Sequence, residues 1–305
     1  MPIISVVSPV YLAAGNISEL CRRLEIALAQ ITADYEILLV EDGSPDSSWD
    51  EIVQESSRNN RIRGLKLSRN FGQHQAITAG IDFATGDWVV VMDCDLQDPP
   101  ELIPDLYKRG KEGSDVVVAL FEERQGKKSQ QLLSRLFWRL LKWLTGLPFD
   151  HRVGNFRIFS RRAADSFKLY REQARLLGGI NALAGFRTSH ISATRAERFT
   201  GKSAYNFRKQ LDTAIELALA YSDKPLRIMV TFGFMISAMS FISGIVIFGM
   251  GLSGIIIVPG WVSVMVSLYL LGGLVLANLG ILGFYIGKTF DEVKKRPLYI
   301  LETVI

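Results

Sequence analysis

Apolar and polar residues alternate in blocks along the first 120 residues, and each block predicts one strand or helix. Short, mostly β-branched runs predict strands, and apolar residues at helical spacing predict helices. The expected strands are Ile3–Tyr11 (ending at Pro9), Tyr35–Val40, Ile62–Leu67, Val89–Met92 and Val116–Leu120. The expected helices are Ile17–Ile31 with Asn16 as N-cap, one that starts at Ser47 or Ser48, and Gln73–Ala84. This alternation predicts an α/β fold with a mainly parallel sheet covered on both faces.

Three of the expected strands end in polar, turn-forming sequences. Pro9 and Tyr11 close the first strand, Asp42 follows the second, and Asp93 and Asp95 follow the fourth. Ligands bind at the carboxyl ends of the strands in open sheets of this type. We therefore expect the three sequences to meet at one edge of the sheet and to form a site there.

The fourth strand ends abruptly in Asp93-Cys94-Asp95-Leu96-Gln97-Asp98-Pro99-Pro100. Residues two apart share a face of an extended chain, and oxygen ligands suit Mg²⁺ or Mn²⁺ held partly by substrate phosphates. We expect Asp95 and Gln97 to bind the metal, with Asp93 on the metal or on the ribose of a nucleotide. A solvated polar turn is the alternative, because a bare Asp-x-Asp is common by chance. The buried strand before it and the two prolines after it favour a site.

Two long runs of the C-terminal third are almost free of charge, Leu226–Met250 and Trp261–Gly287. Each is long enough to cross about 30 Å of hydrocarbon. Basic residues flank both runs, which by the positive-inside rule makes both flanks cytoplasmic. We expect a cytoplasmic domain over 1–224, two transmembrane helices within 225–288 (about 226–250 and 262–287) and a cytoplasmic tail over 289–305. A helix over about 130–147 has a broad apolar stripe interleaved with basic residues and is expected in the membrane interface, with a core-facing helix as the alternative.

The charge of the chain limits the classes of partner that it can bind, and its cysteine content bears on disulfide formation. The 305 residues carry a net charge of +4, with pI about 9.0 and mean hydropathy +0.18. Basic residues clustered beside apolar segments favour an anionic lipid bilayer over nucleic acid as a partner. Cys21 and Cys94 form no disulfide framework, and the N-terminus shows no signal-peptide pattern.

Five stretches, in this order, resemble the family 2 glycosyltransferases. The resemblance is closest to the membrane-bound polyprenyl-phosphate glycosyltransferases, which include dolichol-phosphate mannose synthase and the bactoprenol glucosyltransferases. The stretches are Val7-Ser8-Pro9-Val10-Tyr11, Val40-Glu41-Asp42-Gly43-Ser44, Leu67-Ser68-Arg69-Asn70-Phe71-Gly72-Gln73, Met92 to Pro100, and Gly154-Asn155-Phe156-Arg157. The resemblance covers essentially the whole chain and implies a GT-A fold, a nucleotide-binding α/β sandwich.

The resemblance also implies an activity. This is inverting transfer of a sugar from a nucleotide sugar, UDP-linked rather than GDP-linked, to a polyprenyl phosphate. The expected location is the cytoplasmic face of the inner membrane, in a multi-pass protein that forms a homo-oligomer, with a tetramer suggested by relatives. The ionised phosphate of the acceptor is already a nucleophile near pH 7, so positioning and electrostatics should dominate over general-base catalysis.

Residue roles follow from the same resemblance. The expected nucleotide-sugar ligands are Pro9, Tyr11, Asp42, Ser44, Asn70, Gln73 and Asp93. Asp93, Asp95 and Gln97 match the metal site, and Asp95 and Asn155 match catalytic positions. The expected acceptor-phosphate ligands are Arg124, Arg135, Arg198, Lys202 and Ser203. A purely structural turn is the alternative for Ser44, and headgroup binding is the alternative for Arg135.

Asn155 departs from the family pattern, since several relatives carry Asp there as a possible base. An asparagine cannot accept the proton, so either no base is needed or this assignment fails. Two other functions stay open. A processive polysaccharide synthase would usually show a Gln-x-x-Arg-Trp stretch and more spans, both missing here. A non-catalytic scaffold that binds nucleotide sugars would not need the Asp93, Asp95 and Gln97 set.

Overall fold

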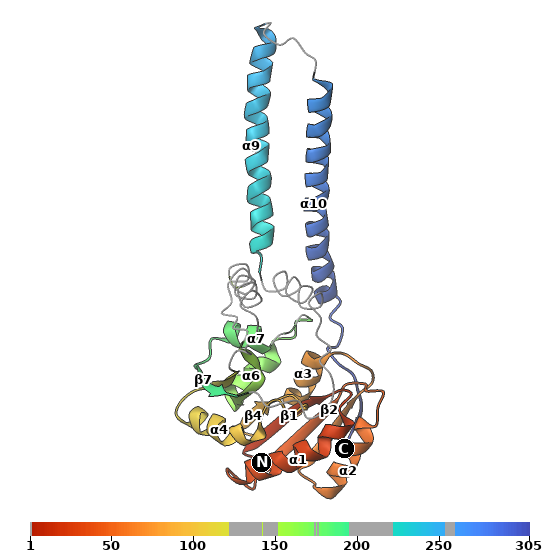
Figure 1. Cartoon of the computed structure of the whole chain (residues 1–305), viewed down its shortest axis with the longest axis vertical. Helices are drawn as coiled ribbons and strands as arrows, with labels where there is room; N and C mark the ends of the chain where they lie inside the picture. The colour runs from red at the N-terminus through yellow and green to blue at the C-terminus, as the bar shows by residue number, and fades with distance from the viewer. Residues whose placement is uncertain are drawn as a thin grey trace. The chain divides into compact units, whose positions relative to one another are not determined.

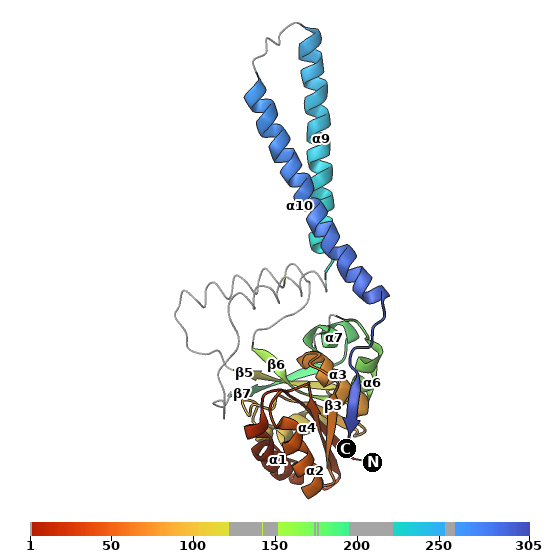
Figure 2. The ribbon, with the colours of Figure 1, turned by 90° about the vertical axis from the view of Figure 1, so that its right-hand side faces the viewer.

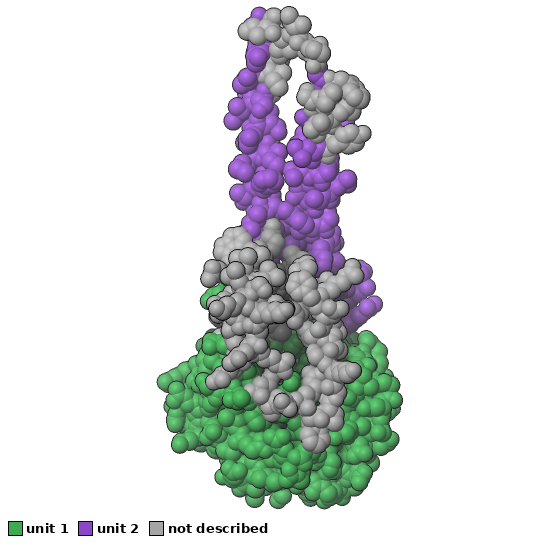
Figure 3. Space-filling view, in the orientation of Figure 1, with its two compact units in different colours: residues 1–142, 147–206, 297–305 green, residues 143–146, 207–296 purple. Residues whose placement is uncertain are grey.

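The computed structural model describes residues 2–121, 142, 152–173, 175, 177–194, 222–253 and 260–305. The expected interfacial helix (apart from residue 142) and the expected acceptor-phosphate ligands lie outside the described residues; those ligands are Arg124, Arg135, Arg198, Lys202 and Ser203. The chain divides into two units. The first comprises residues 1–142, 147–206 and 297–305, and the second residues 143–146 and 207–296 (Figure 3).

One eight-stranded sheet forms the centre of the first unit, in the order β7-β5-β6-β4-β1-β2-β3-β8. Figure 1 shows its central strands β4, β1 and β2 side by side. Its strands are β1 (Ile4–Val10), β2 (Tyr35–Glu41), β3 (Ile62–Leu67), β4 (Trp88–Val91), β5 (Val116–Phe121), β6 (Val153–Ser160), β7 (Thr188–Ala193) and β8 (Leu301–Val304). Strand β6 is antiparallel to β4 and β5, and β8 is antiparallel to β3, while the other pairings are parallel. The mainly parallel sheet predicted from the sequence is confirmed.

Helices cover both faces of this sheet (Figure 2). The first hydrophobic cluster lies under α1 (Ala14–Ala29), α2 (Ser48–Arg58) and α4 (Ile103–Lys111), and the second under α3 (Gln73–Phe83), α6 (Arg161–Leu169) and α7 (Leu177–Ala184). Successive residues of a strand face opposite sides, so Val6 belongs to the first cluster and Val7 to the second. Strands buried on both faces are apolar throughout, which is why their sequence runs are continuous.

The start of α1 differs from the expectation. The helix begins at Ala14 and Asn16 is buried in its first turn, so the prediction of Asn16 as N-cap is wrong. The loop after β2 and the first residue of α2 supply the acceptors instead. The Ala13 N–H donates to Ser48 Oγ (3.2 Å) and the Ala14 N–H to Asp46 Oδ2 (3.3 Å). Side chains distant in sequence thus satisfy the helix donors that a local cap would normally take.

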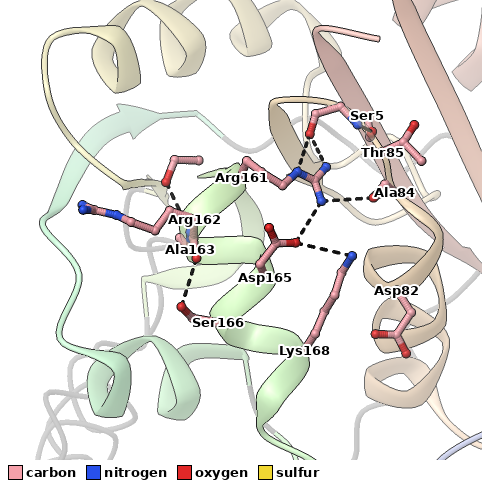
Figure 4. A network of polar contacts seen from close by, with 12 residues as sticks. Ser5, Asp82, Ala84, Thr85, Arg161, Arg162, Ala163, Asp165, Ser166 and Lys168 are labelled. Carbon is pink, nitrogen blue, oxygen red and sulfur yellow. Dashed lines mark hydrogen bonds and ion pairs between the residues drawn. The ribbon is translucent and has the colours of Figure 1, made fainter. Parts of the chain in front are cut away.

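One contact of α3 and one of α6 help to hold these helices against the sheet. Gly80 of α3 lies against Val7 of β1, where an added Cβ would overlap the valine side chain. At the start of α6, the Arg161 guanidinium donates to the carbonyl oxygens of Ala84 and Gly86 and pairs with Asp165 (Figure 4). This network lies at the amino end of β4, whereas the expected site lies at the carboxyl end. The network therefore stabilises the fold and is not part of that site.

The segment after the second long helix returns to the sheet. Strand β8 pairs with β3, and Gly64 and Ile305 exchange both backbone hydrogen bonds (3.2 and 3.0 Å). The Tyr299 hydroxyl donates to Asp82 Oδ2 (2.8 Å), and Lys66 pairs with Glu302 (2.9 Å). Part of the expected tail is therefore an edge strand of the first unit.

The second unit contains α9 (Lys224–Leu252) and α10 (Trp261–Val293). Within the described residues, these two helices are long and apolar enough to cross a membrane, over Leu226–Ser243 and Leu270–Val293. No part of either window is buried. A helix of a soluble core buries its apolar stripe, whereas a spanning helix presents apolar side chains to lipid on every side. The exposure therefore favours membrane association.

Candidate active site

The carboxyl ends of β1, β2 and β4 are neighbours, because β1 lies between the other two strands. Tyr11 follows β1, Asp42 follows β2, and Asp93 comes two residues after β4. The structure thus brings the three polar sequences to one edge of the sheet, as expected.

Pro9 sits within β1 at no cost to the sheet. The Val7 carbonyl accepts the N–H of Met92, which follows β4. Backbone groups two residues apart in a strand face the same neighbour, so the backbone of Pro9 also faces the β4 side. The β1–β4 ladder ends at the Val7–Val91 pair, so no partner requires the N–H that proline lacks. Tyr11, 45% exposed, emerges directly after this strand. A role for Tyr11 in stacking on a nucleotide base stays a prediction.

Asp42 joins two loops. It is buried, and its Oδ1 and Oδ2 accept the N–H groups of Phe71 (2.7 Å) and Gly72 (2.9 Å). Burial raises the pKa of the Asp42 carboxyl, although the two backbone bonds oppose this. Gly43, at φ +61°, lies against the backbone of Arg69 and Asn70 with no room for a Cβ. The exposed Asn70 therefore lies at the same rim as Asp42.

Ser44 forms part of the turn after β2. Its hydroxyl accepts the N–H of Leu12 (2.8 Å) and donates to Asp46 Oδ1 (2.6 Å). These bonds connect the loop after β1 with the loop after β2. A nucleotide-binding role for Ser44 stays a prediction, and the turn role is visible in the geometry.

In the loop after β4, half-buried residues alternate with buried ones. Asp93, Asp95 and Gln97 are half-buried, whereas Cys94, Leu96 and Asp98 are buried. Asp98 Oδ2 accepts the Asp93 N–H (3.2 Å), and Asp95 Oδ1 accepts the Gln97 N–H (3.1 Å). Leu96 takes the left-handed φ of +61°, which is rare for a leucine and typical of constrained functional loops. The three expected metal ligands thus lie in one short loop whose own acids, Asp95 and Asp98, accept its backbone N–H groups.

Two amides meet at Asp93. Gln73 Nε2, at the first residue of α3, and Asn155 Nδ2, on β6, donate to Asp93 Oδ1 at 2.7 and 3.2 Å. The register explains the second contact. Val91 is opposite Arg157 in the antiparallel β4–β6 pair, so two further residues place Asn155 opposite Asp93.

Arg157 is a site residue to which the sequence analysis gave no role. It is buried, and its guanidinium donates to the carbonyl oxygens of Gly154 (2.6 Å) and Asn155 (3.2 Å). Burial lowers its pKa to about 10, while Asp93 and Asp98 oppose the shift. Arg157 is therefore charged at pH 7 and offsets the acids of this loop. A cation among apolar strand residues was the signal that could have identified it.

His74 follows Gln73 in α3. Burial lowers its pKa to about 4, with the charges of Arg157 and Arg175 adding to the effect. The imidazole is consequently neutral at physiological pH.

The donor set at the end of β4 fits a hard divalent cation. Among the described residues, no group of three or more His, Cys, Asp or Glu side chains is placed to hold a metal. Asp93 and Asp95 with the amide of Gln97 offer oxygen donors only, in a number too small for a closed protein cage. Mg²⁺ and Mn²⁺ are commonly held by one or two carboxylates, with substrate phosphates and water completing the shell. The residues present therefore fit a metal that binds together with a diphosphate.

Comparisons with known proteins agree with this geometry. Residues 5–173 match the family described as Glycosyl transferase family 2. The chain is 34% identical over 278 residues to a prophage bactoprenol glucosyl transferase homolog of Escherichia coli, covering 89% of each chain. It is 31% identical over 308 residues to an undecaprenyl-phosphate 4-deoxy-4-formamido-L-arabinose transferase of Klebsiella pneumoniae, covering 99% of this chain and 93% of the relative.

A solved structure supports the fold. A mannosyltransferase from Pyrobaculum calidifontis, in complex with GDP-Man and Mn²⁺, aligns with a TM-score of 0.52 at 16% identity, over 72% of this chain and 63% of that one. The family match spans more than half of the chain, and both relatives match nearly all of it. The chain therefore belongs to glycosyl transferase family 2, and it is a glycosyltransferase with a GT-A fold.

Proposed function

We propose that this enzyme transfers a sugar from a nucleotide sugar to a polyprenyl phosphate, with inversion at the anomeric carbon. The observation that carries the proposal is the combination of two features in one chain. The first is the edge of the sheet where Tyr11, Asp42, Asp93 and Asp95 gather. The second is the pair of helices α9 and α10 with exposed apolar side chains. A lipid-linked acceptor explains why one enzyme has both, and the two relatives are named for bactoprenol and undecaprenyl phosphate.

The proposed donor is a UDP-sugar. Asp42 shares both carboxylate oxygens with backbone N–H groups of the next loop. Because both oxygens already accept one hydrogen bond, Asp42 has little acceptor capacity left for a base. Uracil brings one ring N–H, whereas guanine brings a ring N–H and an amino group, so uracil is favoured. In this proposal Tyr11 packs on the base, and Asp93, Asp95 and Gln97 hold Mg²⁺ or Mn²⁺.

The mechanism needs little from the chain beyond positioning. The acceptor phosphate is largely ionised at pH 7, and one of its oxygens attacks the anomeric carbon while the nucleoside diphosphate leaves. The bound metal would neutralise charge on the departing diphosphate. The residues of the site bind the donor, and hydrogen bonds hold the carboxylates of the site in place. We place the reaction at the cytoplasmic face of the inner membrane, with two spans per chain and a homo-oligomeric assembly.

A transfer assay tests the proposal. Purified full-length protein receives polyprenyl phosphate, Mn²⁺ or Mg²⁺, and a panel of UDP- and GDP-sugars, and label is followed into the lipid phase. We expect lipid-linked sugar from a UDP-sugar, loss of transfer with chelator, and loss of transfer in Asp95→Ala while the protein still folds. Donor binding without transfer to any polyprenyl phosphate would contradict the proposal and favour a non-catalytic scaffold.

A further inference from the structure

The clearest unassigned feature of the site is that two amides from different elements converge on one oxygen. Gln73 Nε2 approaches Asp93 Oδ1 from α3, and Asn155 Nδ2 approaches the same atom from β6. An ionised carboxylate only accepts hydrogen bonds, so each amide must turn its NH₂ group towards Asp93. Two donors on one oxygen restrict rotation of the carboxylate and set the direction of the other oxygen, Oδ2.

Each amide is itself held by backbone structure. Gln73 is the first residue of α3, and the N–H of the preceding residue, Gly72, donates to Asp42. The backbone carbonyl oxygen of Asn155 accepts a hydrogen bond from the buried Arg157 guanidinium. A chain of contacts therefore runs from Asp42, expected at the nucleotide base, through the start of α3 to Asp93 and on to β6. Side chains positioned in this way lose little further freedom when a ligand binds.

From this geometry we infer that Gln73 and Asn155 are positioning residues that orient Asp93 for the metal and the diphosphate. The inference rests on the proposed function, and it gives the Asp93 carboxylate a fixed direction within the site. Asn155 then has a use that requires no basicity, which suits a side chain that cannot accept a proton near pH 7. Gln73 acts on Asp93 in the same way.

Metal affinity measures this role without turnover. Binding of Mn²⁺ to the full-length protein with saturating UDP is followed by the electron paramagnetic resonance of free Mn²⁺. We expect Gln73→Ala and Asn155→Ala each to weaken Mn²⁺ binding about tenfold, the scale of one hydrogen bond to a charged group.

The decisive comparison uses Asp93→Ala as the background. If both amides act through Asp93, adding Gln73→Ala or Asn155→Ala to Asp93→Ala changes Mn²⁺ affinity no further. An undiminished effect in that background would overturn the positioning role and indicate direct contact with the ligand. Melting temperatures identify any variant that fails to fold, and Asn155→Ser, which keeps a donor, then replaces Asn155→Ala and should lose less affinity. Wild-type protein that binds no Mn²⁺ with UDP or GDP would contradict the proposed function itself.

Discussion

Replacing Asp42 tests the connection between the nucleotide rim and the fold. In Asp42→Asn, one side-chain oxygen remains for one of the two N–H donors, Phe71 or Gly72, and an NH₂ group faces the other. A buried donor without an acceptor costs about 1–3 kcal/mol. The variant also removes a buried charge whose pKa is raised by burial, which returns part of that cost. We expect a net loss of about 1–2 kcal/mol.

The loss is measurable as melting temperature and as donor affinity. For a domain of this size, 1 kcal/mol corresponds to about 2–4 °C, so Asp42→Asn should melt about 2–8 °C below the wild type. The Kd for UDP should rise about tenfold, because the loop that Asp42 holds belongs to the proposed base site. Asp42→Ala removes both acceptors and should exceed Asp42→Asn in both measurements. The exposed Asp34→Asn serves as the matched control for loss of one charge.

Two results would refute this reasoning. An unchanged melting temperature in Asp42→Ala would mean that Asp42 does not hold the loop after β3. A lowered melting temperature with an unchanged Kd for UDP would confine Asp42 to the fold and remove it from the base site.

Three further predictions concern the fold. Gly80→Ala forces a Cβ into Val7 and should cost about 1–3 kcal/mol, measured by thermal unfolding; an unchanged melting temperature would contradict the close packing of α3 on β1. Burial alone would raise the pKa of Glu36, but its hydrogen bonds outweigh burial and lower it. The stability that Glu36 contributes is thus present above its unfolded pKa of about 4.3 and lost as the pH falls through the lower folded value, so the difference between wild type and Glu36→Gln should shrink at acidic pH. Tyr299→Phe removes the 2.8 Å bond to Asp82 and should speed proteolysis near β8 while leaving UDP affinity unchanged.

The central strands were predictable because burial on both faces makes a strand apolar throughout. Strands β1 to β5 match the expected runs within a few residues. Strand β7, Thr188–Ala193, is an edge strand rich in polar residues, and β8 is only four residues long. Neither has a pattern that separates it from a loop, because only pairing with a distant neighbour stabilises it.

The site was predictable to the same extent. Asp42, Asp93 and Asp95 follow recognisable strands, so their shared edge could be inferred from the order of elements. The contacts of Gln73 and Asn155 with Asp93 could not be inferred, because they depend on the antiparallel register of β6 against β4. Such a register is set by contacts between residues far apart in the sequence.

Strand β8 has a consequence for synthesis of the enzyme. It follows α9 and α10 in the sequence, yet it pairs with β3, whose residues are translated long before those helices. Domains generally fold as they leave the ribosome, and an unpaired strand edge is prone to wrong associations in the meantime. The last strand of this sheet can therefore pair only after both helices have been translated, so β3 keeps an unpaired edge throughout their synthesis.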